Sequence, residues 1–363
     1  MKFLRWLLHS FVLTANVICA LLFVASAYSD CVSPAKFLPF AYMGLLFPFF
    51  ALATLCFMFY WLFFGKKKNM LVSLSALILC WHAVSNYLPL NAPRKDIPKE
   101  NTIKVLSYNI MSFAYKKHTS EEANPIISYL ANSGADIICL QEYVEFTQRD
   151  YPSRSKIFKA LKAYPYRSIF KSGEKTGIAV FSKYPISKSR QISYKSNTNR
   201  SSIHQVNVKG KKITLINNHL ESFKLTTEDR SRYKDFMKSM DSKHFNDLKG
   251  TILQKLGPAF VIRSRQAEKI AKEIENAQTD YVVVCGDFND TPVSYTHRTI
   301  LGNLKDSFVE SGRGLGISYN ENMFWFRIDN IFHSPNMKSY NCTVEKIKYS
   351  DHYPIWTYLE FVE

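Results

Sequence analysis

The chain has 363 residues, enough for one large domain or for a domain with an accessory segment. Its formal net charge of +17 suits an anionic partner such as nucleic acid or lipid headgroups, but a solvated basic surface would give the same charge. The seven cysteines show no CxxC spacing, so the sequence supports neither a zinc site nor a disulfide framework.

The first ninety residues contain three apolar runs. Residues 7–24 are almost entirely apolar, residues 37–64 carry no charged side chain, and residues 70–90 are apolar with a few polar interruptions. A helix needs about 20 apolar residues to cross the hydrocarbon core of a bilayer. The sequence therefore predicts an N-terminal bundle of about three transmembrane helices within residues 1–90, at about 6–27, 38–64 and 70–90.

Positive charges predict how this bundle is oriented. Lys2 and Arg5 precede the first run, and Lys66–Lys68 lie between the second and third. Cytoplasmic loops are enriched in Lys and Arg, so these residues are expected in the cytoplasm and the chain beyond about residue 92 outside it. In a bacterial inner membrane, that outside compartment is the periplasm. If the third run lies in the interface instead of crossing, the carboxy-terminal part is cytoplasmic.

A signal peptide is the alternative reading of the first run. Ala25-Ser26-Ala27 resembles a signal-peptidase site. The apolar run before it is long for a cleaved signal, so we favour an uncleaved anchor.

Residues 91–101 are polar, contain two prolines and are interpreted as a linker to a soluble domain, residues 102–363. In that domain, apolar runs typical of strands alternate with helical patterns. Lys209–Lys212 predicts a hairpin turn, and the basic stretch 183–200 is interpreted as a solvated loop. The expected strands are 102–108, 136–140, 177–181, 203–208, 213–217, 281–285, 328–332 and 355–361; the expected helices are 126–131, which starts after Ser120–Glu122, and 263–278.

Polar residues follow the apolar part of strand after strand. In open α/β sheets, ligands bind where strand ends converge. Carboxylates, amides and histidines without a thiolate suit a hard cation, Mg²⁺ or Mn²⁺, and a water that attacks a phosphoryl group. No Walker loop, GxSxG elbow or HExxH motif offers another chemistry. The strand-end residues are Asn109, Glu142, His219, Asp287, Asn289, Asp329, Asp351 and His352.

Seven motifs in this order resemble the endonuclease/exonuclease/phosphatase superfamily. Its members include deoxyribonuclease-like nucleases, abasic-site endonucleases, sphingomyelinases and inositol phosphatases. GDFND and SDHYP are the specific motifs of the set, and the resemblance covers roughly residues 102–362. The motifs are LSYNI (106–110), LQE (140–142), GIAVFSKYPI (177–186), NNHLES (217–222), GDFND (286–290), RIDNIF (327–332) and SDHYP (350–354).

The resemblance implies a four-layer α/β sandwich of two packed mixed β-sheets flanked by helices. It also implies that Glu142, with Asn109 and Asp351, holds the metal. Asp287 and Asn289 would orient or deprotonate the attacking water, and His352, oriented by Asp329, would contact the scissile phosphate.

The remaining site residue, His219, matches a phosphate or leaving-group donor, and its presence argues against the abasic-site branch. Glu174 is the candidate acidic partner of His219. Asp290 is interpreted as a turn residue, and Arg327 as a residue that fastens its strand.

Residues 221–257 form a charged insertion with apolar residues at roughly helical spacing. It predicts one or two amphipathic helices packed on the domain, or a lid close to the site because it follows His219.

Three functions remain open. A nuclease suits the basic charge, and a phospholipid or sphingolipid phosphodiesterase suits the membrane segment. The third is an inactive membrane scaffold, against which the intact set of carboxylates and histidines argues. No protein partner is inferred, and the sequence does not fix the oligomeric state.

Overall fold

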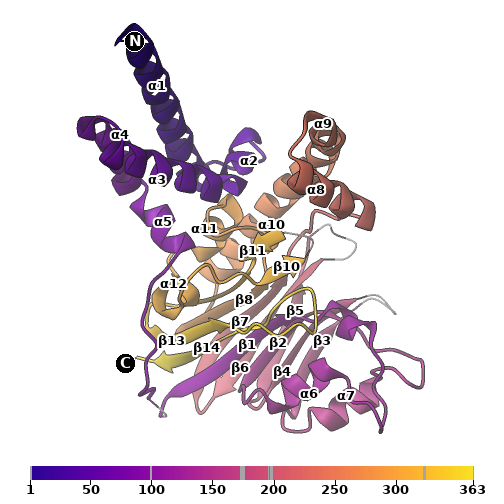
Figure 1. Ribbon diagram of the computed structural model, residues 1–363. Helices are drawn as coiled ribbons and strands as arrows, with labels where there is room; N and C mark the ends of the chain where they lie inside the picture. Colours follow the sequence, from indigo (N-terminus) through magenta and orange to yellow (C-terminus); the bar gives the residue numbers. More distant parts are fainter. Residues whose placement is uncertain are drawn as a thin grey trace.

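Two six-stranded β-sheets packed face to face form the centre of the molecule (Figure 1). The computed structural model describes residues 2–98, 100–171, 176–194, 196, 199–321 and 324–362. Apolar side chains from both sheets, among them Val105, Ile137, Ile213 and Val283, form the layer between them. This arrangement confirms the predicted sandwich of two mixed sheets.

The first sheet has the strand order β13-β14-β1-β2-β4-β3, and the second has the order β5-β6-β7-β8-β12-β9. The pairs β1–β2 and β7–β8 are parallel and the other pairs are antiparallel. The strands of the first sheet are β13 (Met337–Val344), β14 (Ile355–Phe361), β1 (Thr102–Asn109), β2 (Ile137–Tyr143), β4 (Gly177–Ser182) and β3 (Tyr166–Phe170). Those of the second are β5 (Ile186–Ile192), β6 (Arg200–Val208), β7 (Lys211–His219), β8 (Tyr281–Asp287), β12 (Asp329–His333) and β9 (Lys305–Asp306).

Helices cover the outer faces of the two sheets. α6 (Pro125–Asn132) and α7 (Arg154–Ala160) pack on the first sheet. α10 (Gly257–Glu275) and α11 (Tyr295–Leu301) pack on the second, with Phe288 and Phe332 in the same cluster. The short α12 (Ser307–Ser311) lies beside β13 and β12.

Three local predictions were wrong. α6 covers the expected residues 126–131, but its start signal is Asn124, whose side chain accepts from the backbone nitrogens of Ile126 and Ile127, and not Ser120–Glu122. α10 begins at Gly257, six residues before the expected start, with a proline in its first turn. The stretch 183–200 is not a loop throughout: it contains β5, an edge strand that pairs with β6 and exposes Ser187, Lys188, Ser189 and Arg190.

The N-terminal part is a set of apolar helices, some of them bent: α1 (Lys2–Ala27), α2 (Pro39–Leu45), α3 (Phe47–Phe63), α4 (Met70–Leu79) and α5 (Trp81–Tyr87). α1 is long and apolar enough to cross a membrane. α2 and α3 meet at 60°, and α4 and α5 at 64°, so the count of spans reaches three only if each bent pair is one span. The first bend has a local cause, because a proline in the first turn of α3 cannot continue the hydrogen bonds of α2.

The N-terminal helices pack directly on the catalytic part of the chain. Val293 lies in their apolar cluster together with Phe23 and Phe47. Asp30 Oδ2 forms an ion pair with Arg298 Nη1 at 3.4 Å. The buried Arg327 donates to the backbone oxygen of Asn86 in α5, so this arginine fastens a helix as well as its own segment.

Two further elements project from the same end of the sandwich. α8 (Thr227–Ser239) and α9 (Ser242–Thr251) form a helical hairpin, and a π-helical turn (Ile252–Leu256) leads into α10. β10 (Tyr319–Glu321) and β11 (Phe324–Phe326) form a small β-hairpin. The two hairpins are joined by a stack of Tyr233 on Phe324 with ring centroids 4.0 Å apart. The insertion 221–257 thus contains two helices, as expected.

Candidate active site

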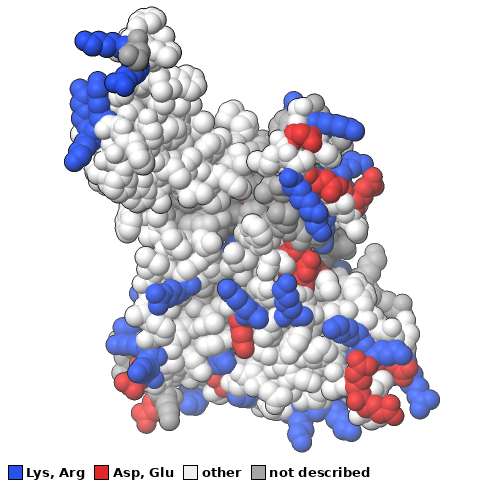
Figure 2. All heavy atoms as spheres, in the orientation of Figure 1, with Lys and Arg blue, Asp and Glu red and all other residues white. Residues whose placement is uncertain are grey.

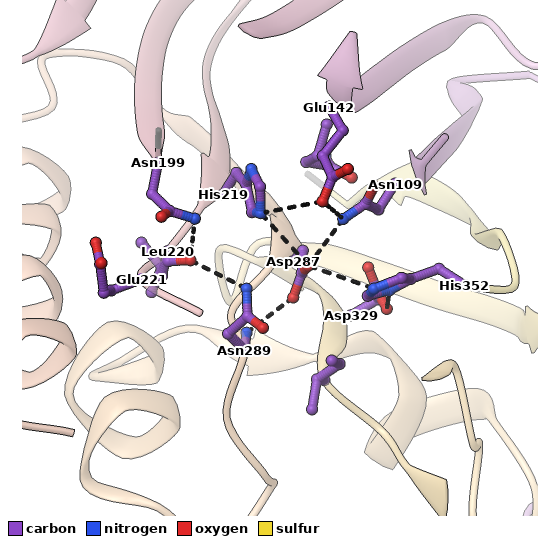
Figure 3. Close-up of polar contacts among 12 residues, drawn as sticks. Asn109, Glu142, Asn199, His219, Leu220, Glu221, Asp287, Asn289, Asp329 and His352 are labelled. Atoms are coloured by element: carbon purple, nitrogen blue, oxygen red, sulfur yellow. Dashed lines mark hydrogen bonds and ion pairs between the residues drawn. The ribbon is translucent and has the colours of Figure 1, made fainter. Parts of the chain in front are cut away.

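The eight predicted site residues come together at one end of the sandwich. Asn109, His219 and Asp287 are the last residues of β1, β7 and β8, and Asp329 is the first residue of β12. The strand register sets His219 opposite Asp287 and Asp287 opposite Asp329. Because parallel strands end at the same edge of a sheet, residues far apart in the chain converge there (Figure 3).

Asp329, His352 and Asp287 form a buried row. His352 Nδ1 donates to Asp329 Oδ2 at 2.8 Å, and its Nε2 lies 3.7 Å from Asp287 Oδ2. Burial opposes the charged form of His352, but the Asp329 and Asp287 carboxylates hold its pKa well above the usual value. One imidazolium is therefore held between two carboxylates with its Nε2 facing the centre of the site (Figure 3).

Asp287 is the central carboxylate. Its Oδ2 accepts a hydrogen bond from Asn109 Nδ2 at 3.1 Å, and its Oδ1 accepts the Asn289 backbone N–H at 2.8 Å. Burial is the main cause that raises the pKa of Asp287 to about 6; the Asp329 charge adds to the rise and the His352 charge opposes it. A carboxylate with this pKa can accept a proton near neutral pH.

A second group of carboxylates lies on the other side of Asn109. Glu142 occupies a β-bulge in β2 with a positive φ of 53°, and its Oε1 accepts from Asn109 Nδ2 at 3.2 Å. Burial, and then the charge of Asp351, raises the pKa of Glu142. Asp351 itself is half-buried and accepts from Ser350 Oγ at 3.1 Å.

Glu142 and Asp351 fit a hard divalent cation. The charge of Asp351 opposes the ionisation of Glu142, and an oxygen-binding cation held by these two carboxylates would relieve that repulsion. Asn109 offers less to a metal in this arrangement, because its Oδ1 accepts the Met111 backbone N–H at 3.2 Å. Asp287, Asp329 and His352 also have potential ligand atoms within 4.8 Å of one another, but a protonated His352 would repel a cation there.

His219 is the second histidine of the site, and its charge state differs from that of His352. Burial lowers the pKa of His219, although the Asp287 carboxylate opposes this effect. Its Nε2 lies 3.8 Å from Glu142 Oε1 and 3.8 Å from Asp287 Oδ2. A neutral imidazole in this place can donate one N–H to a substrate oxygen. The candidate partner Glu174 lies outside the described residues.

The segment after β8 departs from extended geometry. Asn289 has a positive φ of 52°, and its Nδ2 donates to the backbone oxygen of Leu220 at 3.0 Å. Phe288 is buried against Phe332 with ring centroids 5.2 Å apart. Asp290 does more than shape a turn, because its Oδ2 accepts both Arg263 Nε at 3.2 Å and Thr296 Oγ1 at 2.8 Å.

Arg263 ties this segment to the loop after β7. The buried guanidinium also donates from Nη1 to the backbone oxygen of Glu221 at 2.7 Å. The loops that follow His219 and Asn289 are thus held by one side chain.

Sequence reasoning missed two other contributors. Gln141 Nε2 donates to Asn217 Oδ1 at 2.7 Å and so links the two sheets. Both amides are buried, and each lies within two residues of a site residue, in the motifs LQE and NNHLES, which is the signal that the sequence offers. Arg230, on α8, is half-buried. Burial raises the pKa values of Glu142 and Tyr319, and the charge of Arg230 acts in the opposite direction on both. Tyr319 in turn packs on the His352 ring at 5.0 Å. No pattern in the sequence pointed to Arg230.

Comparison with known proteins agrees with this geometry. The model of a family described as the Endonuclease/Exonuclease/phosphatase family matches residues 106–352. The chain belongs to this family. Members of the family are phosphoric ester hydrolases that depend on divalent metals. The carboxylates of Glu142 and Asp351 are oxygen ligands of the kind that such metals take.

Solved structures show the same fold at low sequence identity. The human nocturnin catalytic domain with bound sulfate is 16% identical, with a TM-score of 0.52 over 73% of this chain and 97% of that chain. D. rerio TDP2 complexed with a single-strand DNA product is 18% identical, with a TM-score of 0.50 over 72% of this chain and 100% of that one. A family protein from Beutenbergia cavernae is 14% identical, with a TM-score of 0.50 over 72% of each chain.

The N-terminal helices have a separate counterpart. A model described as a domain of unknown function matches residues 9–87. No curated protein matches the sequence.

Proposed function

We propose that this family member is a membrane-anchored, Mg²⁺-dependent phosphodiesterase whose catalytic domain faces the periplasm of a bacterial inner membrane. The observation that carries the proposal is the arrangement of three side chains: His352 Nδ1 lies 2.8 Å from Asp329 Oδ2, and the Nε2 atoms of His352 and His219 lie 3.7 Å and 3.8 Å from Asp287 Oδ2. The raised pKa values of His352 and Asp287 and the lowered pKa of His219 are in keeping with this arrangement. Such a set can stabilise, deprotonate and donate within one small volume.

The reaction is hydrolysis of a phosphate ester. Asp287 accepts the proton of a water that attacks phosphorus, the P–O bond to the leaving group breaks, and the leaving alkoxide takes a proton from solvent, so that one phosphate product and one alcohol form. His352 faces the phosphoryl oxygens as a cation held by Asp329, and the N–H of His219 donates to the phosphate or to the leaving oxygen. Glu142 and Asp351, with Asn109 beside them, would hold Mg²⁺, whose positive charge would stabilise the negative charge that develops on the phosphoryl group.

The charge distribution supports the anchor and its orientation. Asn69 contacts His9 at 3.3 Å, so the Lys66–Lys68 turn lies beside the first turns of α1, near Lys2. The opposite end of α1 runs into the turn that pairs with α11 of the catalytic domain. A helix of 26 residues is about 39 Å long, more than the roughly 30 Å of a hydrocarbon core.

Between these two ends the N-terminal helices show an uncharged belt (Figure 2). The basic end would therefore lie in the cytoplasm and the catalytic domain on the other side. Fusing alkaline phosphatase to the carboxy terminus tests this orientation: the fusion should be active, and an inactive fusion refutes it.

A panel of substrates tests the activity. The full chain with Mg²⁺ would be assayed on plasmid DNA, RNA, sphingomyelin, phosphoinositides and a chromogenic diester, beside Asp287→Ala and His352→Ala. We expect hydrolysis of at least one diester that both variants lose. Variants that match the parent on the active substrate would refute the assignment of the site.

A further inference from the structure

The active-site end of the sandwich is the end on which the N-terminal helices are docked. Val293, four residues after Asn289, lies in the apolar core of those helices. The contact is close, because a Cβ on Gly44 of α2 would lie only 2.7 Å from the Val293 backbone oxygen. Arg327, two residues before Asp329, bonds to α5. Two segments that carry site residues thus continue directly into the apolar bundle.

A row of aromatic rings continues from that bundle to the loop after His219. The ring of Tyr42 in α2 lies 5.5 Å from the ring of Phe260 at the start of α10. Phe260 lies 5.2 Å from the ring of Phe223, and the Arg263 guanidinium lies 4.4 Å above Phe223. We call Tyr42, Phe260 and Phe223 the aromatic row. Phe223 and Tyr42 are half-buried, so part of the row is accessible.

The α8–α9 hairpin projects to the same side as the N-terminal helices (Figure 1). Met240, at the turn between α8 and α9, is 69% exposed. The site therefore lies at the end of the sandwich that carries both the apolar bundle and the α8–α9 hairpin. A substrate that approaches from this side meets hydrocarbon-compatible surface on the bundle side and the half-buried Arg230 on the hairpin side.

We propose that the site takes an amphiphilic phosphodiester from the bilayer, with the hydrocarbon of this lipid lying along the aromatic row and its phosphate at His352 and His219. The proposal rests on the phosphodiesterase function proposed above and names its substrate class. The row leads to α2 of the apolar bundle, a surface that favours a hydrocarbon chain over the charged backbone of a nucleic acid. Figure 2 shows an uncharged belt on the N-terminal helices down to the catalytic domain, so a bilayer around these helices would bring its headgroups to the end of the sandwich on which they are docked.

A pair of diesters that differ only in chain length tests the proposal. Hexadecyl p-nitrophenyl phosphate in phosphatidylcholine vesicles and methyl p-nitrophenyl phosphate share the reacting group and the coloured product. The full chain is reconstituted in the same vesicles with Mg²⁺. We expect kcat/KM for the hexadecyl diester to exceed that for the methyl diester by at least tenfold, since a buried chain of sixteen carbons adds favourable transfer at about 0.8 kcal/mol per CH₂.

Two variants separate the aromatic row from mere partitioning of the lipid into vesicles. Phe223→Ser should lower the ratio of hexadecyl to methyl rates by at least about fivefold, because it removes one aromatic contact of the chain. Phe146→Ser is the matched control: Phe146 is also half-buried and also four residues beyond a site residue, Glu142, but it packs against Tyr115 and Tyr151, away from the N-terminal helices. This control should leave the ratio unchanged.

The outcomes distinguish the two proposals. If the parent hydrolyses both diesters with a ratio near one, or if Phe223→Ser and Phe146→Ser have the same ratio as the parent, the lipid proposal is overturned and the phosphodiesterase stands. Cleavage of plasmid DNA without cleavage of the hexadecyl diester would also overturn the lipid proposal and leave the phosphodiesterase function standing. If the parent hydrolyses none of these, the phosphodiesterase function itself is overturned, and the lipid proposal with it.

Discussion

Replacing Asp329 by Asn tests how the buried row tunes the site. The change keeps the shape of the side chain and removes the charge that His352 Nδ1 contacts at 2.8 Å. A hydrogen bond to a charged group contributes about 1.5–3 kcal/mol, and about 1.36 kcal/mol corresponds to a tenfold change in rate. We therefore expect kcat/KM on a soluble chromogenic diester to fall by roughly 10- to 150-fold.

The pH profile of the same variant gives a second, independent reading. The Asp329 carboxylate contributes to the raised pKa values of both His352 and Asp287. Without it, both pKa values fall. Activity that needs charged His352 is then lost at a lower pH on the alkaline side, and activity that needs ionised Asp287 appears at a lower pH on the acid side. The whole profile should move to lower pH when measured at saturating Mg²⁺.

Asp306→Asn is the matched control for this experiment. Asp306 is also buried and also bonds to a histidine, His297 Nε2 at 3.1 Å, but it lies outside the site. This variant should keep the position of the pH profile. An Asp329→Asn enzyme with the parent's rate and profile, or an Asp306→Asn enzyme with a shifted profile, would refute the tuning argument.

Three further predictions concern charge and stability. Arg230→Gln should raise KM for the soluble diester at least about threefold, as expected for one lost phosphate contact. Arg232→Gln, on the exposed side of the same helix, should leave KM unchanged. Equal KM values for the two variants in steady-state kinetics would exclude a specific role for Arg230. Arg263→Met should destabilise the protein by about 3–5 kcal/mol by leaving the buried Asp290 carboxylate without its cation, and a thermal unfolding midpoint equal to the parent's would contradict this. Despite burial, the hydrogen bonds that Asp306 accepts hold its pKa below the usual value, so its stabilisation is present above its unfolded pKa of about 3.9 and is lost as the pH falls through its folded pKa. Thermal midpoints from pH 6 to pH 3 should therefore fall more steeply for the parent than for Asp306→Asn, and parallel curves would show that this carboxylate contributes nothing.

The central sheets and the convergence of the site residues were accessible from the sequence because both have local signatures. A buried strand reads as a short apolar run, and residues such as Asp287 and His219 stand where those runs end. Once β7 and β8 pair in parallel, geometry alone brings the two residues opposite each other. The motifs then supplied the order of the strand ends along the chain.

Contacts between distant segments leave no such signature. Val293 follows a catalytic motif and looks like an ordinary turn residue, yet it packs among N-terminal helices more than 200 residues away in the chain. Arg230 sits in a charged helix whose sequence pattern does not single it out. The stack of Tyr233 on Phe324 and the ion pair between Asp229 and Lys255 hold that helix in place. Glu142 takes a left-handed conformation at a bulge, which no propensity of glutamate predicts.

Polar patterning also misled at one edge of the sandwich. β5 is an edge strand with one exposed lysine, one exposed arginine and two exposed serines, so this strand has the composition of a loop. Only its pairing with β6 identifies it.

Hydrolysis of the soluble diester in H₂¹⁸O with Mg²⁺ tests most directly whether this site directs water to phosphorus. The account predicts one ¹⁸O atom in the phosphate product and none in the released alcohol, at a rate that Asp287→Ala loses. Label in the alcohol, or labelled phosphate formed at the same rate by Asp287→Ala, would contradict it.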